Sequence, residues 1–172
     1  MEPPRSASIS RALRRTFQAF RAAADAELSS LGMSLPLANV LMDVGAEDGI
    51  SSAELARRVV VTAQTMNDLV AGLLDRKLIE RRQHTSHGRI LTVHLTAPGQ
   101  QMVERCTAIT ADVERRMLRA FTAAERRALL RDLVRCSDAL ASYQRSIAAP
   151  GGKPQQLAAS PRRRQRASGS RT

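Results

Sequence analysis

The apolar residues of this chain change their spacing part-way along it, and that change restricts the fold to a mainly helical one with a small β-hairpin. From Ile9 to Leu31, apolar side chains recur every three or four residues, which is the period of an amphipathic helix. Between Leu78 and Leu95, two short segments instead alternate apolar and polar residues and are rich in β-branched residues, which predicts strands. Because aromatic residues make up only 2% of the chain, the core must be aliphatic, which suits helix packing.

Most of the predicted helices have a recognisable beginning or end. Gly32 ends the first helix, and Ser34 is the expected N-cap of the second, which has a proline in its first turn. Capping-box patterns at 51–54 and 122–125 begin two more helices. The predicted helices span residues 9–31, 34–44, 52–59, 62–76, 96–120 and 122–147.

Two short helices separated by residues 60–62 form a helix-turn-helix candidate, and a hairpin follows directly. The hairpin strands are predicted at 78–82 and 89–95, joined by the polar residues 83–88. This order is the winged-helix arrangement, in which the second helix enters the major groove of duplex DNA and the hairpin lies beside it. The sequence therefore predicts a DNA-binding lobe over residues 34–95.

Outward-facing residues at the start of the second of these helices are predicted to meet base edges. Glutamine and asparagine can each pair with adenine through two hydrogen bonds, and a threonine methyl group can contact thymine. In the hairpin, Arg89 is predicted to enter the minor groove, and His84 or His87 to reach a phosphate. The candidate residues on the helix are Thr62, Ala63, Gln64, Thr65, Asn67 and Asp68.

The charge of the chain agrees with a nucleic-acid partner. The 27 Lys and Arg residues exceed the 16 Asp and Glu residues by 11, a surplus that is typical of proteins with a polyanionic partner. Residues 147–172 contain six basic residues and no acidic one, which leaves +5 for the rest. This Arg-rich tail has no periodicity and is predicted to be disordered, as are residues 1–7. It either adds nonspecific DNA affinity or is a solvated appendage.

Signals for an enzyme or a bound cofactor do not stand out. The sequence has no Gly-rich phosphate loop after a strand, no G-x-S-x-G and no paired carboxylates, so an enzyme and a cofactor are not expected. His84, His87 and His94 lie close together in sequence, but no Cys or cluster of carboxylates joins them, so no metal site is predicted.

The cysteines and the hydropathy indicate a cytoplasmic protein. Cys106 and Cys136 do not form a C-x-x-C motif, and both are predicted to be small buried residues in a reducing compartment rather than redox switches. No apolar run approaches the roughly 20 residues that span a bilayer. The N-terminus also lacks a basic region followed by an apolar stretch, so neither a signal peptide nor a membrane partner is expected.

The sequence resembles the MarR family, the multiple antibiotic resistance regulators. The resemblance rests on SAELARRV at 52–59, TAQTMNDLVAGLLDRKLIERR at 62–82, Gly-Arg at 88–89, Leu95-Thr96 and Gly99, and on the order of the elements from residue 9 to residue 147. It implies a winged helix-turn-helix protein over residues 8–146. Its dimerisation helices, 8–31 and 96–146, would intertwine in a homodimer.

The same resemblance implies a repressor that binds a pseudo-palindromic operator in double-stranded DNA and is released by a small aromatic or phenolic effector. It places three residues where the family reads bases and one on the wing arginine: Gln64, Thr65, Asn67 and Arg89. Two positions depart from the family pattern. His87 replaces the wing aspartate that orients the arginine, and Asp68 stands where arginine is frequent, which places a negative charge near phosphate.

The alternative is an architectural protein that coats DNA without sequence preference. Such a protein binds mainly through charge, with a steep salt dependence. The polar, uncharged face of Gln64, Thr65 and Asn67 favours base reading instead. For Arg57 and Arg58, a phosphate contact and a solvated helix face remain equal alternatives. The sequence therefore predicts a sequence-specific regulator, whose operator, effector and target genes it does not identify.

Overall fold

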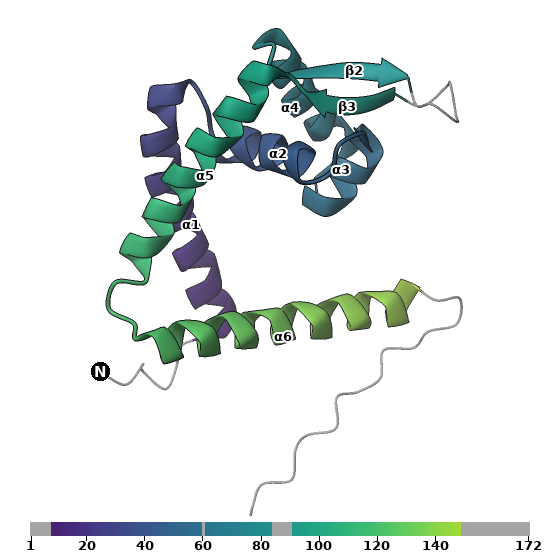
Figure 1. Ribbon diagram of the computed structural model, residues 1–172. Coiled ribbons are helices and arrows are strands. Elements are labelled where there is room, and N and C mark those ends of the chain that lie inside the picture. Colours follow the sequence, from purple (N-terminus) through teal and green to yellow (C-terminus); the bar gives the residue numbers. More distant parts are fainter. Residues whose placement is uncertain (1–7, 60, 84–90, 149–172) are drawn as a thin grey trace, which may run out of the picture. The chain divides into compact units, whose positions relative to one another are not determined.

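The computed structural model describes residues 8–59, 61–83 and 91–148 of the chain. The chain divides into two compact units, Met1–Ala120 and Phe121–Thr172. The first unit contains α1 (Ile9–Leu28), the short 3₁₀ helix η1 (Ser29–Leu31), α2 (Leu35–Ala46), β1 (Ile50–Ser51), α3 (Ser52–Val59), α4 (Ala63–Asp75), β2 (Ile79–Gln83), β3 (Leu91–Leu95) and α5 (Ala97–Met117), and the second contains α6 (Ala123–Ala148) (Figure 1).

The mainly helical fold with a small antiparallel sheet confirms the predicted fold class. Strands β2 and β3 form the predicted hairpin, with Ile79 opposite Leu95 and Gln83 opposite Leu91. The structure adds a third strand, β1, so that the sheet order is β1-β3-β2. Ile50 lies between the predicted helices 34–44 and 52–59, where no strand was predicted because two residues are too few to show alternation, yet Ile50 is buried opposite Val93.

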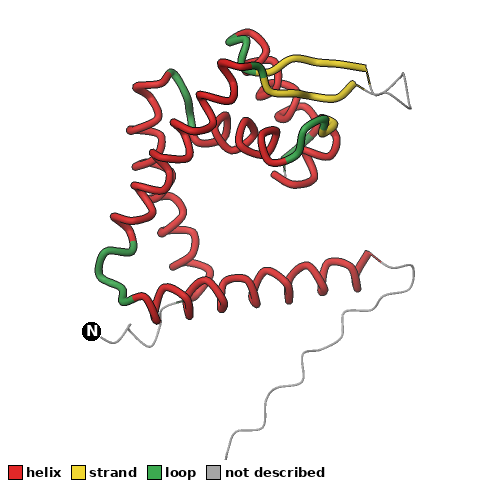
Figure 2. The backbone as a smooth tube through the Cα atoms, viewed as in Figure 1, coloured by secondary structure: helices red, strands yellow, loops and turns green. Residues whose placement is uncertain are grey.

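One aliphatic core holds the first unit together, as the low aromatic content predicts. Helix α2 is central to it and packs against α4, α5 and the wing strand β3. Helices α1 and α5 cross in the tube of Figure 2 and pack against each other. The largest fully buried side chains are Leu28, Leu41, Leu55, Met66, Leu73, Val40, Val44, Val70, Val93 and Cys106.

The start of α2 is capped from another helix. Ser34 occupies the predicted N-cap position, but its hydroxyl makes no capping hydrogen bond. The backbone N–H of Leu35 instead donates to the Asp25 carboxylate of α1 at 2.6 Å. A carboxylate at a helix N-terminus also interacts favourably with the helix dipole. Asp25 therefore fixes the turn between α1 and α2, where Gly32, the predicted end of the first helix, adopts the left-handed conformation (φ 66°).

Helix α4, strand β2 and helix α5 meet at a tight backbone junction. At the end of α4, the N–H of Lys77 donates to Leu74 and the N–H of Leu78 donates to Leu73, with Lys77 left-handed at φ 57°, which is a Schellman motif. Thr96 begins α5: its N–H donates to the Leu78 carbonyl oxygen at 3.1 Å, and its hydroxyl accepts from the N–H of Gly99 at 3.1 Å. The start of α5 thus lies directly on the backbone that follows α4.

Only glycine fits the position on α5 that faces this junction. A Cβ atom on Gly99 would lie 1.9 Å from the Leu78 carbonyl oxygen and 2.9 Å from its carbon. Both are backbone atoms, so no side chain can rotate away to make room.

We expect Gly99→Ala to destabilise the protein by about 2 kcal/mol or more, because overpacking against a fixed backbone forces the helix to shift. The matched control is Gly72→Ala in α4, where the nearest atoms to a Cβ are the ends of two side chains at 3.4 and 3.5 Å. This control should leave the free energy of unfolding unchanged or raise it by up to about 1 kcal/mol, because alanine is the better helix former. Urea unfolding measures both, and equal stability of the two variants would contradict the close approach.

The second unit consists, in its described part, of helix α6. The capping box predicted at its start is present: the backbone N–H and the hydroxyl of Thr122 bond to the Glu125 carboxylate at 2.7 and 2.8 Å, and the Glu125 N–H donates back to the Thr122 hydroxyl at 3.3 Å. These hydrogen bonds lower the pKa of Glu125 below its usual range. Several large apolar side chains of α6 are exposed: Leu130, Leu133, Val134, Leu140, Tyr143 and Ile147.

No helix in the part of the chain that the structure describes combines the length and apolarity needed to cross a bilayer.

Candidate nucleic-acid interface

The first turn of α4 is a polar surface held on a buried apolar face. Met66, Val70 and Leu73 are fully buried and fix the rotation of α4 on the core. The side chains between them therefore point outward. All six candidate residues on this helix are exposed, as predicted: Thr62, Ala63, Gln64, Thr65, Asn67 and Asp68.

Thr62 caps α4. Its hydroxyl accepts a hydrogen bond from the backbone N–H of Thr65 at 3.1 Å, and the two threonine hydroxyls are 2.9 Å apart. The cap satisfies a backbone donor that the first helical turn otherwise leaves free. It therefore orders the turn that carries the candidate base-reading side chains.

Two candidate residues of α4 that lie one helical turn apart bond to each other. The Gln64 amide nitrogen donates to the Asp68 carboxylate at 3.1 Å. A glutamine amide has two N–H donors and one oxygen acceptor. The bond to Asp68 uses one donor, so a second donor and the oxygen remain for the N7 and N6 groups of an adenine. Asp68 can thus orient Gln64 without preventing two-bond pairing to a base.

The arginines of α3 are paired with carboxylates. The Arg57 guanidinium bonds to Glu54, and the Arg58 guanidinium bonds to Glu47 in the loop before β1. The Arg57 hydrogen bond is the main cause that lowers the pKa of Glu54. The predicted capping box here is half formed, since Glu54 N–H donates to the Ser51 hydroxyl at 3.2 Å while its carboxylate turns to the arginines.

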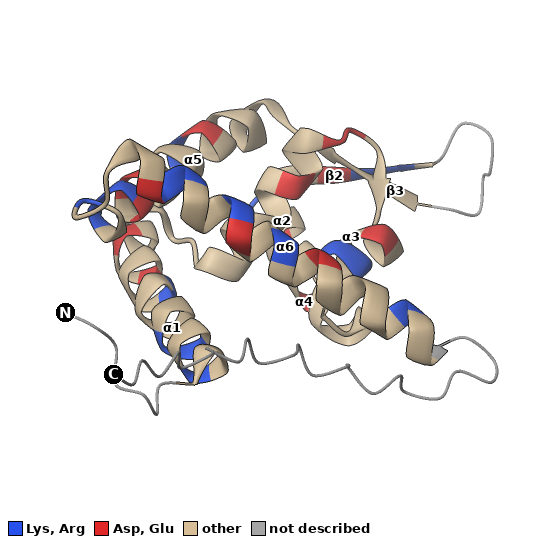
Figure 3. Cartoon of the chain, turned by 90° about the horizontal axis from the view of Figure 1, so that it is seen from below, with Lys and Arg blue, Asp and Glu red and all other residues tan. Residues whose placement is uncertain are grey.

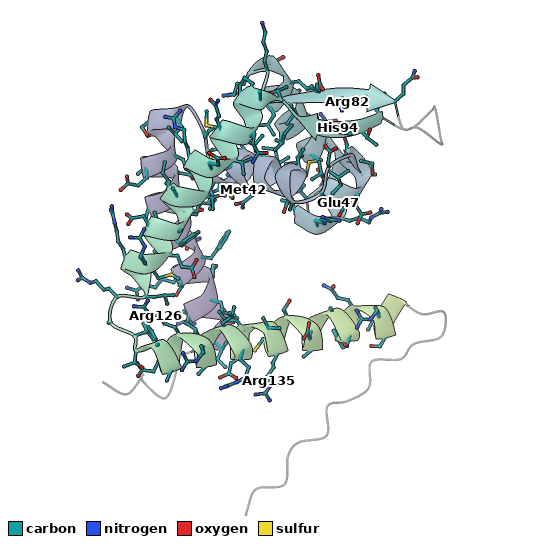
Figure 4. The ribbon with its side chains drawn as sticks, in the orientation of Figure 1. Met42, Glu47, Arg82, His94, Arg126 and Arg135 are labelled. Carbon is teal, nitrogen blue, oxygen red and sulfur yellow. The ribbon has the colours of Figure 1, made fainter. Side chains whose placement is uncertain are left out.

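The described strands of the wing carry a further polar cluster (Figure 4). The Nε atom of the Arg82 guanidinium donates to the Glu80 carboxylate on the same strand, at 2.9 Å. His94 on β3 bonds through Nδ1 to the Asp48 carboxylate at 2.7 Å and through Nε2 to the Thr92 hydroxyl at 2.9 Å. The predicted DNA contacts His84, His87 and Arg89 lie outside the described residues.

Sequence reasoning missed the role of His94. It considered this residue only as a metal ligand, because its partner Asp48 is 46 residues away in the chain and in a turn. No group of three or more His, Cys, Asp or Glu side chains in the described ranges could hold a metal ion.

A cavity of about 320 Å³ lies between α1 and α5, away from the helix-turn-helix. Its walls are mainly apolar and include Phe20, Val113 and Met117. At its edge, the Arg116 guanidinium bonds to Glu27 at 3.0 Å. The combination of an aromatic wall and one cationic side chain can accommodate a small aromatic acid.

Comparisons with known proteins match this architecture. A model of the MarR family matches residues 31–90. The HTH-type transcriptional repressor Rv2887 of Mycobacterium tuberculosis is 36% identical over 121 residues, which cover 70% of this chain and 87% of that protein. The chain belongs to the MarR family.

Two solved structures of the Mycobacterium tuberculosis MarR family protein Rv2887 show the same likeness. Its complex with salicylic acid is 34% identical with a TM-score of 0.65, covering 78% of this chain and 99% of that one. Its complex with DNA is 31% identical with a TM-score of 0.66, covering 76% and 98% respectively. The resemblance drawn from the sequence is therefore confirmed.

Charge is distributed over this MarR protein in a way that sets the first turn of α4 apart. Figure 3 shows blue Lys and Arg positions along α1, α3, α5 and α6, and red Asp and Glu positions that alternate with the blue ones within α5. Between Thr62 and Asn67, α4 carries no charge, and Asp68 is the first charged residue after Arg58. The turn can therefore contribute hydrogen bonds to bases but little attraction to phosphates.

The two cysteines of this MarR protein differ in environment. Cys106 is fully buried in α5, and burial raises the pKa of its thiol. Cys136 is exposed on α6, so the prediction that both are buried is wrong for Cys136. The reason is that no side chain of α6 is buried within its own unit, whereas α5 packs against α1 and α2.

We expect the two thiols to react at different rates with iodoacetamide at pH 8. The Cys106 thiol is buried and its raised pKa reduces the reactive thiolate, so its alkylation should be at least about tenfold slower than that of Cys136. Mass spectrometry of peptides from timed samples measures both rates, and a sample unfolded in guanidinium is the control. Equal rates in the native protein would contradict the burial of Cys106.

Proposed function

We propose that this protein is a homodimeric transcriptional repressor that binds a pseudo-palindromic operator in duplex DNA and releases it on binding a small aromatic acid. The observation that carries the proposal is the exposed, uncharged first turn of α4 on a buried apolar face. An ordered polar turn of this kind reads base edges rather than coating phosphates. The assignment places the protein in the cytoplasm and gives it no catalytic role.

Gln64, Thr65 and Asn67 are the proposed base-reading residues. Gln64 is oriented by Asp68, which gives a physical reason for an acidic residue at a position where the family frequently has arginine. Asn67 is exposed on the same turn and can pair with a second adenine. Arg89 and either His84 or His87 are proposed to contact the minor groove and the phosphates beside it.

Exposed apolar side chains support the homodimer. On α1, Ile9, Leu13 and Phe17 are 76%, 46% and 61% exposed. On α6, Leu133, Leu140 and Ile147 recur every seven residues and are also exposed. Large apolar side chains grouped on an exposed helix face are typical of interaction sites. We propose that residues 8–31 and 96–146 bury these side chains against a second copy, with residues 34–95 as the DNA-binding lobe.

The cavity between α1 and α5 is the proposed effector site. Its volume of about 320 Å³ is sufficient for a single aromatic ring with substituents. Phe20 can contact the ring, and Arg116 can exchange Glu27 for the carboxylate of the ligand. The salicylic acid complex of the Mycobacterium tuberculosis relative supports this chemical class. A ligand between these helices favours a spacing of the two recognition helices that does not match successive major grooves.

Sequence-specific binding predicts that Asn67→Ala reduces operator affinity by about tenfold, because a paired base contact contributes about 1–3 kcal/mol. Fluorescence anisotropy with DNA from upstream of the protein's own gene, beside a scrambled duplex, measures the affinity at two salt concentrations. Gln101→Ala, an exposed amide on α5, is the matched control and should bind as the wild type does.

In this titration the architectural alternative gives a different result. Equal affinity for both duplexes, with a steep salt dependence that Asn67→Ala leaves unchanged, would refute base reading and favour a nonspecific DNA-coating protein.

The effector site predicts that millimolar salicylate weakens operator binding by the wild type, and that Arg116→Gln reduces this effect by about fivefold or more, because a charged hydrogen bond to the carboxylate is lost. The control is Arg115→Gln, since Arg115 is the neighbouring residue, is outside the cavity lining and bonds to Asp112 at 3.0 Å. The same anisotropy assay measures both variants. An identical response of the two would exclude Arg116 as the carboxylate partner.

A further inference from the structure

The loop between α2 and β1 connects the helix-turn-helix to the wing through two neighbouring carboxylates. Glu47 bonds to Arg58 on α3, and Asp48 bonds to His94 on β3. The imidazole ring of His94 lies against Gly49, where an added Cβ would be 3.3 Å from its Cε1 atom. Gly49 is left-handed, at φ 79°, which permits this close contact. His94 is thus the wing residue that bonds to the loop.

The hydrogen bonds of His94 continue across the wing. Its Nε2 atom is 2.9 Å from the Thr92 hydroxyl oxygen, and that hydroxyl donates to the Arg82 carbonyl oxygen on β2 at 3.2 Å. Thr92 is only 4% exposed, so water has little access to replace a lost partner. The chain of bonds therefore runs from Asp48 through β3 to β2, the two strands that lead to the wing tip.

The number of protons decides whether all these bonds can exist together. An ionised Asp48 only accepts, so the Nδ1 atom of His94 must carry a hydrogen. With a neutral imidazole, Nε2 has none and must accept from Thr92, whose single hydroxyl hydrogen is then lost to Arg82. With an imidazolium, Nε2 donates to the Thr92 hydroxyl oxygen, and the hydroxyl hydrogen remains on the Arg82 carbonyl. The complete set of bonds requires a protonated His94.

We infer that His94 is a positioning residue for the wing and that its protonation strengthens DNA binding. The inference rests on the proposed function, since the strands that His94 connects lead to the proposed contact Arg89. Loss of the proton leaves unmade one of the two bonds of the Thr92 hydroxyl, both of which lie within the wing, and removes the positive charge from the bond to Asp48, so the wing strands are held less firmly. Operator affinity should therefore fall as the pH rises through the range in which histidine titrates.

The charged groups that face His94 include two carboxylates and two arginines. Asp48 bonds to it directly, and Glu80 stands opposite it in the strand register, on the same face of the sheet. Arg82 faces the same region but is bonded to Glu80, and Arg58 is bonded to Glu47. These two arginines are thus each paired with another carboxylate, while Asp48 is bonded to His94.

The test is operator affinity of the full chain at pH 5.8 and pH 8.0, measured by anisotropy at constant ionic strength. The wild type should bind about threefold to tenfold more weakly at pH 8.0, the change expected for one hydrogen bond. His94→Gln has no titrating group there and should lose most of this pH dependence. Any small pH dependence that remains in His94→Gln is attributed to His84 and His87, which this variant and the wild type both contain.

Thr92 provides the matched pair of variants. Thr92→Val keeps the shape of the side chain without its hydroxyl and should reduce the pH dependence, whereas Thr92→Ser keeps the hydroxyl and should retain it. Thermal melts at both pH values verify that each variant is folded. A wild-type pH dependence that persists in His94→Gln, or equal behaviour of Thr92→Val and Thr92→Ser, would overturn the inference while specific DNA binding stands. A wild type that binds no duplex at either pH would refute the proposed function as well.

Discussion

Helix α4, the wing and helix α5 are held together by a contact between backbones rather than side chains. The Leu78 carbonyl oxygen accepts from the N–H of Thr96 and lies where a side chain on Gly99 would be. Leu78 itself closes the Schellman motif that ends α4. Because backbone atoms cannot change rotamer, this junction fixes the direction of three elements at once. The exposure of the first turn of α4 depends on it as much as on the buried side chains beneath.

The same junction provides a rigid connection between the cavity and the DNA-binding lobe. Helix α5 is continuous from Gly99, at the junction, to Val113, which lines the cavity. A ligand that moves α5 relative to α1 must therefore also move the backbone on which α4 and β2 are seated, since a packed helix moves largely as a unit. This route gives the proposed effector a mechanical connection to α4 without any contact between them.

Local sequence signals predicted the elements of this fold, and contacts between distant residues account for what they missed. Helix periodicity, the helix end at Gly32 and the Thr62 and Thr122 caps are each determined within a few residues, and each is present. Two features depend on partners far along the chain: the cap of α2 comes from Asp25, and β1 is a strand only because β3 lies beside it. Neither leaves a period or a motif in the sequence.

The candidate site, like the fold, was predicted from the sequence only in part. The six residues on α4 could be named because the position of Met66, Val70 and Leu73 on one face determines which residues lie on the other. His94 could not be assigned its role, since its partner Asp48 follows another helix. Cys136 was expected to be buried because helical cysteines usually are, but α6 has no described neighbour in its own unit to cover it.

Specificity and affinity have different sources in this molecule. The exposed turn of α4 has hydrogen-bonding groups and a single charge, the carboxylate of Asp68, which repels phosphate but orients Gln64. Arginines that could attract DNA from α3 are already bonded to Glu54 and Glu47. Since DNA affinity depends largely on contacts to phosphates, the proposed interface also needs cations outside α4 and α3, such as the proposed wing contact Arg89. In the proposed interface α4 therefore supplies discrimination between bases rather than overall affinity, and the bonds that hold the wing bear on how tightly the repressor binds.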